Sequence, residues 1–316
     1  MCRRVCFLFS CLLALLSFTL ASCGGSSTTG ASSSAKPVVL CTIFSYFDAA
    51  RAIAGDKLDV QILLPPSASP HEYETSARDK KTADAAALYI KNGLGLDDHY
   101  DKLIDTSKTK ILNISEKIPK DELLMTQEVS LDQPGMAPRK EEEDESAGNP
   151  HIWLDPHIQI SAAEAIRDAL IQLDPTDKDA FDANATKYID TLKKLDADFA
   201  AAVATFKTKD FIGFHSAYEY LAHRYGLHQV ASIEEVPGTG LSPAQAQKII
   251  NLIKTDHIHY IAIESAFPES ATKIIESETG VKTIILQPLE TYDDANASYD
   301  SYMRDNLKAL QTALNG

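Results

Sequence analysis

Positive charge is scarce in this sequence. Its 30 lysines and arginines stand against 45 aspartates and glutamates, which gives a formal net charge of −15 at pH 7. This balance argues against nucleic acid as a partner, because phosphates require a basic face. It is compatible with a cationic partner, although solubility alone would account for most of it. The 316 residues, 44% hydrophobic and 24% charged, are typical of a globular protein with one large or two ordinary domains.

Long apolar runs are missing except at the N-terminus. There MCRR supplies positive charge, VCFLFSCLLALLSFTL is apolar, and small residues follow. This pattern is typical of a cleaved signal peptide and is short for a membrane span. Because LASC at 20–23 resembles a bacterial lipobox, we expect a signal peptide at 1–22 and lipid on Cys23. Residues 23–36 are predicted to be a flexible Gly/Ser/Thr-rich tether; the alternative is a plain secretory signal with an accidental cysteine.

Cysteine is equally scarce. Of the five cysteines, three leave with the predicted signal peptide and Cys23 would carry the lipid. Only Cys41 remains, within the apolar run PVVLCTIF, where we expect it to be a small buried hydrophobic residue. No disulfide can then form within the mature chain, so an oxidising compartment is tolerated but not exploited.

The rest of the chain alternates short apolar runs with amphipathic stretches, which favours α/β units with mostly parallel sheets. No short repeat is visible. We expect an α/β fold of two lobes, each with a mostly parallel four-stranded sheet flanked by helices. The predicted strands are 37–43, 58–64, 88–92 and 108–114 in the first lobe, and 210–215, 227–233, 259–265 and 282–288 in the second.

One long rigid helix is predicted to join the lobes. Residues 176–206 contain no glycine or proline and carry one apolar stripe at four-three spacing. At 1.5 Å per residue this helix would run for roughly 45 Å. It would separate an N-terminal lobe over 37–175 from a C-terminal lobe over 207–316. The stripe consists of Phe181, Ala185, Tyr188, Leu192, Leu195, Phe199, Ala202 and Phe206.

Residues 116–149 lack apolar periodicity and include the acidic run EEEDE. We predict a mobile surface loop here, inserted in the N-terminal lobe. Acidic runs are usually just solvated, and gathering cations near a site is the alternative role.

Three of the nine histidines follow predicted strands or a loop end. His71 lies after the second strand, His151 at the end of the acidic loop, and His215 at the end of the fifth strand. Ligands of open α/β sheets gather at the carboxyl ends of strands. Three histidines at such positions, spread over both lobes, therefore indicate a shared site.

Imidazole suits zinc, copper, nickel or iron, and a closed tetrahedral zinc site needs a fourth donor. We expect that donor just after the last strand, where Glu290 is the first carboxylate. Asp155, four residues after His151, is predicted to start a helix or to orient a ligand.

Several segments resemble the metal-binding lipoproteins of bacterial ABC importers for zinc and manganese. They are PHEYE, NGLGLD, NPHIWLDP, FHSAYEYLAHRYGL and ETGVKTIILQPLE, collinear from about Pro37 to the C-terminus. The resemblance implies two lobes bridged by a rigid helix, with metal in the cleft between them. It places the first three ligands on His71, His151 and His215, and a histidine at the third position favours zinc over manganese. Many members carry aspartate at the position of Gln287, whereas another zinc-binding branch uses a glutamate three residues later, which is Glu290 here.

By this resemblance the protein is an extracytoplasmic, lipid-anchored solute-binding protein that passes Zn2+, its transported ligand, to an ABC permease. It would be a monomer and not an enzyme. Because histidines must be deprotonated to bind metal, affinity should fall as pH drops through about 6.5. The alternatives are a manganese importer, a surface adhesin, and a zinc hydrolase with an open fourth position, for which no HExxH signature is present.

Overall fold

The computed structural model describes residues 36–125, 148–234, 240–264, 272–294 and 296–315. These residues belong to one compact unit, Lys36–Gly316. The predicted signal peptide, Cys23, nearly all of the tether and residues 126–147 of the predicted acidic loop lie outside the described residues. None of the described helices combines the length and apolar character that a membrane span requires.

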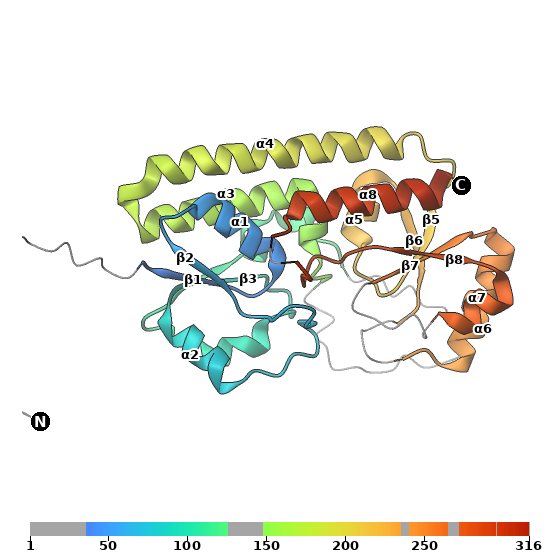
Figure 1. Cartoon of the computed structure of the whole chain (residues 1–316), viewed down its shortest axis with the longest axis horizontal. Helices are drawn as coiled ribbons and strands as arrows, with labels where there is room; N and C mark the ends of the chain where they lie inside the picture. The colour runs from blue at the N-terminus through green and yellow to red at the C-terminus, as the bar shows by residue number, and fades with distance from the viewer. Residues whose placement is uncertain (1–35, 126–147, 235–239, 265–271, 295, 316) are drawn as a thin grey trace, which may run out of the picture. The chain divides into compact units, whose positions relative to one another are not determined.

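Strands and helices alternate in both halves of the unit, as the sequence predicts (Figure 1). The first half contains β1 Val38–Cys41, α1 Phe44–Ala54, β2 Asp59–Ile62, α2 Ala77–Ala85, β3 Ala86–Lys91 and β4 Lys110–Asn113. Two helices follow it, α3 Pro156–Leu173 and α4 Lys178–Val203. The second half contains β5 Asp210–Gly213, α5 Glu219–Tyr225, β6 His228–Ser232, α6 Pro243–Asp256, β7 Tyr260–Ile263, α7 Lys273–Thr279 and β8 Lys282–Ile285, and α8 Tyr299–Asn315 ends the chain.

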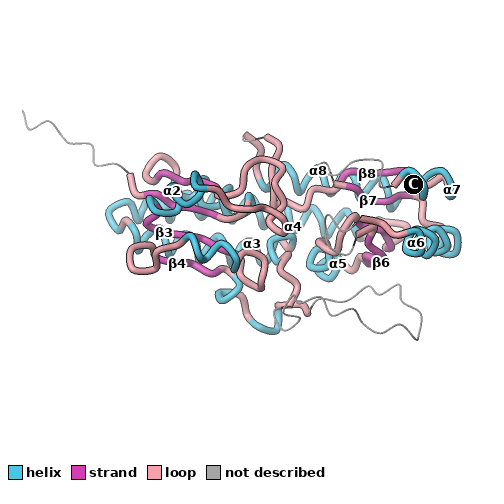
Figure 2. The backbone as a smooth tube through the Cα atoms, turned by 90° about the horizontal axis from the view of Figure 1, so that it is seen from below, coloured by secondary structure: helices cyan, strands magenta, loops and turns pink. Residues whose placement is uncertain are grey.

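Each half forms a four-stranded sheet, in the order β2-β1-β3-β4 and β6-β5-β7-β8. Every strand pairing in the two sheets is parallel, which confirms the predicted fold class. Figure 2 shows β3 beside β4 and β7 beside β8. In parallel sheets all carboxyl ends share one edge, so the loops that follow the strands meet there.

The long helix α4 comprises 26 residues, slightly fewer than predicted. A 3₁₀ turn at Pro175–Asp177 precedes it, and Phe206 lies beyond its end, although its side chain is buried. The buried stripe also differs from the predicted one, because Ile189 and Val203 are buried where the four-three spacing named Tyr188 and Ala202. Which of two adjacent residues is buried depends on the elements that pack against the helix, here α3, α1 and α8.

The two halves share one large hydrophobic core. It includes strands of the first sheet, helices α1, α3, α4 and α8, and residues of the second half such as Phe211, Tyr218 and Leu289. A smaller core lies within the second sheet and α6, around Ile212, Ile249 and Ile261. Helix α4 packs along α3, α1 and α8 (Figure 1), so it is part of the shared core.

Candidate metal centre

His71 lies in the loop between β2 and α2. Its backbone N–H donates to Ser69 Oγ at 3.3 Å, and the hydroxyl of the buried Tyr100 donates to the carbonyl of Pro70 at 3.0 Å. These contacts hold the proline-rich loop against the body of the first half. The imidazole is only 14% exposed.

His151 precedes a short 3₁₀ turn at Ile152–Leu154 and is 4% exposed. Asn149 Oδ1 lies 2.9 Å from both the backbone nitrogen and Nδ1 of His151. Because the amide oxygen can only accept, Nδ1 carries the hydrogen and Nε2 keeps its lone pair in the neutral ring. The side chain of Asn92 donates to the carbonyl of Pro150 at 2.9 Å, which ties this loop to the end of β3.

Asn92, the first residue of the NGLGLD segment at 92–97, is held in place by its neighbours. The buried carboxylate of Asp97 accepts from the backbone N–H groups of Asn92 at 2.6 Å and Gly93 at 2.9 Å, and Tyr46 donates to Asn92 Oδ1 at 2.6 Å. Burial raises the pKa of Asp97 to about 6 despite these hydrogen bonds. Gly93 has φ +80°, and a Cβ there would lie 2.3 Å from Asn113 Oδ1. Glycine is therefore required at this turn.

His215 follows β5 and is 1% exposed. Its Nδ1 lies 2.5 Å from Oε1 of Glu264, and its Nε2 lies 3.2 Å from Nε2 of His151. In both His151 and His215, Nδ1 is hydrogen-bonded to a neighbouring side chain, and Nε2 faces the Nε2 of the other ring.

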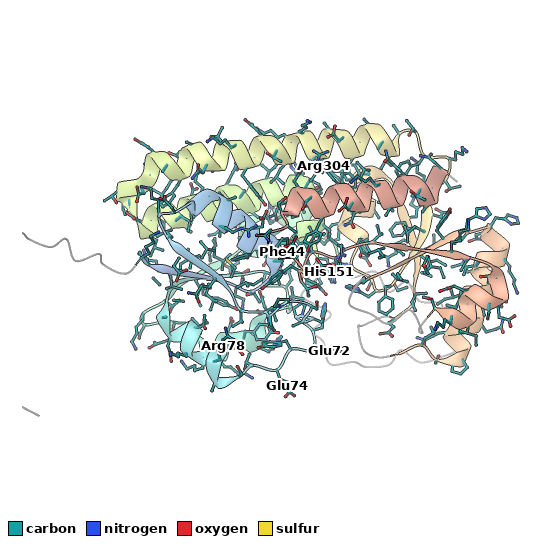
Figure 3. All side chains as sticks on the ribbon, viewed as in Figure 1. Phe44, Glu72, Glu74, Arg78, His151 and Arg304 are labelled. Carbon is teal, nitrogen blue, oxygen red and sulfur yellow. The ribbon has the colours of Figure 1, made fainter. Side chains whose placement is uncertain are left out.

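Glu290 follows β8 and is 2% exposed. Its segment is hydrogen-bonded to the first half: Phe44 N–H donates to the Glu290 carbonyl at 3.2 Å, and Ser45 Oγ donates to the Leu289 carbonyl at 2.8 Å. Leu289 has φ +58°, an unfavourable backbone conformation for a branched side chain. Phe44 and His151 are labelled in Figure 3, in the region between the two sheets.

The single tryptophan makes a second tie between the two halves. Trp153 Nε1 donates to the carbonyl of Pro288 at 2.7 Å, and the Tyr299 hydroxyl donates to the carbonyl of Trp153 at 2.7 Å. All three groups are buried, so these bonds are shielded from water. The NPHIWLDP motif thus supplies both a histidine and the anchor for the Glu290 segment.

Four donor atoms converge, one each from His71, His151, His215 and Glu290, all within 4.8 Å of one another. Glu290 Oε2 lies 3.6 Å from His71 Nε2 and 3.9 Å from His151 Nε2. Zinc donors at about 2.0–2.1 Å in a tetrahedron are roughly 3.3 Å apart, so only a small contraction is needed. His71 Nε2 and Glu290 Oε2 are buried without a hydrogen-bond partner among the described residues. Buried polar atoms left this way are costly, and a cation would satisfy both.

The site's charges are distributed unevenly. Burial and the neighbouring imidazoles of His215 and His71 hold the pKa of His151 well below its usual value. For His215, burial opposes the charged form, but the Glu264 carboxylate outweighs it and raises the pKa to about 8. Burial likewise opposes ionisation of Glu290, but the interactions with His71 and His215 lower its pKa. These shifts favour the ionised form of Glu290 and the protonated form of His215 in the metal-free site.

The four residues predicted from the sequence thus lie together, whereas Gln287 lies outside the cluster, with its backbone paired to the side chain of Asn306. Asp155 caps the N-terminus of α3 through the His157 N–H, which confirms the predicted helix start. Cys41 is buried and free, as predicted.

Sequence reasoning missed Asn149, Asn92 and Glu264, the residues that contact the histidine loops. Glu264 carried a usable signal, since it is the carboxylate near the carboxyl end of the predicted strand 259–265.

Comparison with known proteins agrees with this geometry. Residues 39–313 match the family model described as ZnuA, zinc-uptake complex component A, periplasmic. The zinc-binding lipoprotein AdcA of Streptococcus pneumoniae (strain ATCC BAA-255 / R6) is 33% identical over 278 residues, covering 86% of this chain and 55% of that protein. The chain thus spans about half the length of that relative. The high-affinity zinc uptake system protein ZnuA of Bacillus subtilis (strain 168) is 28% identical over 304 residues, covering 93% of each chain.

Among solved structures, the Zn(II)-bound ZnuA-like domain of Streptococcus pneumoniae AdcA superimposes with a TM-score of 0.73 at 30% identity. The match covers 89% of this chain and 100% of that domain. With its parallel α/β halves, its convergent histidines and a family match over most of its length, the chain belongs to the ZnuA family of zinc-uptake complex components.

Proposed function

We propose that this protein is a zinc-binding solute-binding protein that captures Zn2+ through His71, His151, His215 and Glu290 and delivers it to an ABC permease. The observation that carries this proposal is the convergence of three imidazoles and one carboxylate in a buried site. Borderline-soft nitrogen donors suit zinc better than manganese, which prefers oxygen ligands. One carboxylate and three neutral imidazoles would leave a bound Zn2+ with a net charge of +1.

The family name and the relatives support zinc uptake as the process. The family is described as a component of a zinc-uptake complex, and the S. pneumoniae relative is named a zinc-binding lipoprotein. A family named for uptake favours transport over the zinc-hydrolase alternative. A closed site of four protein donors also leaves no metal-bound water to act as nucleophile.

The proposal also covers the membrane anchor and the division of the chain into lobes. Residues 1–22 would be removed as a signal peptide, and lipid on Cys23 with the tether 23–36 would keep the protein beside its permease. An N-terminal lobe at 37–175 would carry the acidic loop 116–149. The linking span 176–206, within which α4 covers Lys178–Val203, would connect this lobe to a C-terminal lobe at 207–316. Mass spectrometry of the mature protein tests the anchor, since a chain beginning at an unmodified residue would contradict it.

The central test is a competitive zinc titration against a chromophoric chelator, with wild type beside Glu290→Ala and the matched control Gln287→Ala. One tight equivalent is expected in wild type and in Gln287→Ala. Loss of Glu290 should weaken it by more than the about 100-fold that loss of a residue supporting a ligand can cost. Equal binding in all three variants would contradict Glu290 as a ligand. Absence of tight zinc in wild type, with tight manganese instead, would contradict the proposed cargo.

A further inference from the structure

Glu264 is a buried carboxylate directly behind His215. It follows the last residue of β7 and is 2% exposed, and its Oε1 lies 2.5 Å from Nδ1 of His215. The register of β5 and β7 pairs Ile212 with Ile261. His215 and Glu264 each lie three residues further along, so the parallel sheet itself brings them to matching positions at its carboxyl edge.

This contact decides which nitrogen of His215 faces the site. A carboxylate accepts the hydrogen of Nδ1, which leaves Nε2 as the atom that offers a lone pair to a metal. Nε2 lies 3.2 Å from Nε2 of His151, on the side where the four donor atoms converge. Glu264 is not one of those four, so it acts through the histidine.

We propose that Glu264 is a positioning residue for zinc capture: it fixes the ring of His215 so that Nε2 points at the metal. The inference rests on the proposed function, because it requires His215 to bind zinc. His151 is positioned in the same way by a neutral amide two residues before it in its own loop, whereas His215 depends on a charged side chain from another strand. Charged acceptors form the stronger hydrogen bonds, so His215 should depend heavily on this one contact.

A double-mutant cycle on the full chain tests the proposal. Zinc affinity is measured by chelator competition for wild type, Glu264→Ala, Glu264→Gln, His215→Ala and the double variant of His215→Ala with Glu264→Ala. Glu264→Ala is expected to lose about 10–100-fold in affinity. Glu264→Gln should lose less, since its amide oxygen can still accept from Nδ1. The double variant should bind no more weakly than His215→Ala alone, because Glu264 acts only through that ring.

A purely structural role would give a different pattern. Asp48 is a matched control: it is a buried carboxylate, 3% exposed, that accepts from Arg51 and from the backbone N–H of Tyr299, and it is not one of the four clustered donor residues. Asp48→Asn should lower the thermal midpoint of the metal-free protein and leave zinc affinity unchanged. The visible spectrum of bound Co2+ should change in Glu264→Ala and stay the same in Asp48→Asn.

Two results would overturn the inference while leaving the proposed function intact. One is wild-type affinity in Glu264→Ala while His215→Ala binds weakly. The other is an equal loss on removing Glu264 with and without His215. If Glu264→Ala does not fold, the same cycle is run with Glu264→Gln. Absence of tight zinc in wild type would instead overturn the proposed function, and this inference with it.

Discussion

The two halves of the metal centre hold the same residue type in opposite ways. In the first half, His151 is held by the amide oxygen of Asn149, and its pKa is lowered by burial and by neighbouring imidazoles. In the second half, His215 is held by the carboxylate of Glu264, and its pKa is raised to about 8. Both rings are almost fully buried, so the difference comes from the charged or ionisable groups around each ring and not from exposure to water: the Glu264 carboxylate beside His215, and the other two imidazoles beside His151.

The fourth donor makes the asymmetry larger. By sequence Glu290 belongs to the second half, but its backbone and that of Leu289 are hydrogen-bonded to Phe44 and Ser45 at the start of α1. Three of the four donors are thus tied to the first half through neutral backbone and side-chain groups, and His215 alone is held by the second sheet. Stability and zinc affinity should therefore be sensitive to loop geometry in the first half and to charge in the second half.

The largest effect is expected at the turn that supports the His151 loop. Gly93→Ala forces a side chain into φ +80° and into the space of Asn113 and Ser115. Left-handed backbone and overpacking together should destabilise the fold by about 2–4 kcal/mol in urea unfolding. Zinc affinity should also fall.

Gly280→Ala is the matched control in the second half, because its φ is +72° but nothing lies within 4 Å of the new Cβ. It should cost only about 1–2 kcal/mol and leave zinc affinity unchanged. Equal losses of stability in the two variants would show that the crowding at Gly93 has no effect.

A smaller effect is expected from Trp153→Phe. The variant keeps an aromatic ring but removes the hydrogen bond to the Pro288 carbonyl, leaving that buried acceptor unpaired. Unfolding free energy should fall by about 1–3 kcal/mol. Zinc affinity should fall as well, since Pro288 lies two residues before Glu290. Unchanged affinity would mean that the contacts of α1 alone suffice to hold the carboxylate.

The smallest effect is expected for the pH dependence of zinc binding, which tests the pairing of His215 with the Glu264 carboxylate. Zinc must displace a proton from His215 wherever the pH lies below the raised pKa, about 8, of that ring in the metal-free site. Apparent affinity should therefore drop about tenfold per pH unit below that value, a loss of about 1.4 kcal/mol per unit. His151 should not add to the slope near neutral pH, because its pKa is lowered. Chelator competition between about pH 6 and 9 measures this, and a flat affinity from pH 8 to 7 would contradict it.

Much of the fold could be predicted from local patterns. Eight short apolar runs became eight strands, and the uninterrupted amphipathic stretch became α4, since hydrophobic periodicity is a local property of the chain. The exact stripe on α4 could not be predicted, because the choice of Ile189 over Tyr188 depends on which neighbours pack against the helix. The shared core was also missed, since it forms between segments far apart in sequence.

The sequence by itself determined the donors: three histidines and one glutamate, each just after a strand or at a loop end, where parallel topology gathers loops at one edge. Only the tertiary structure decided what each donor contacts. Glu264 behind His215, Asn149 and Asn92 beside the His151 loop, and α1 beside Glu290 are pairings between groups with no common pattern in the sequence. Their energies depend on distance and burial, and both are set only once the two sheets and the shared core have packed together.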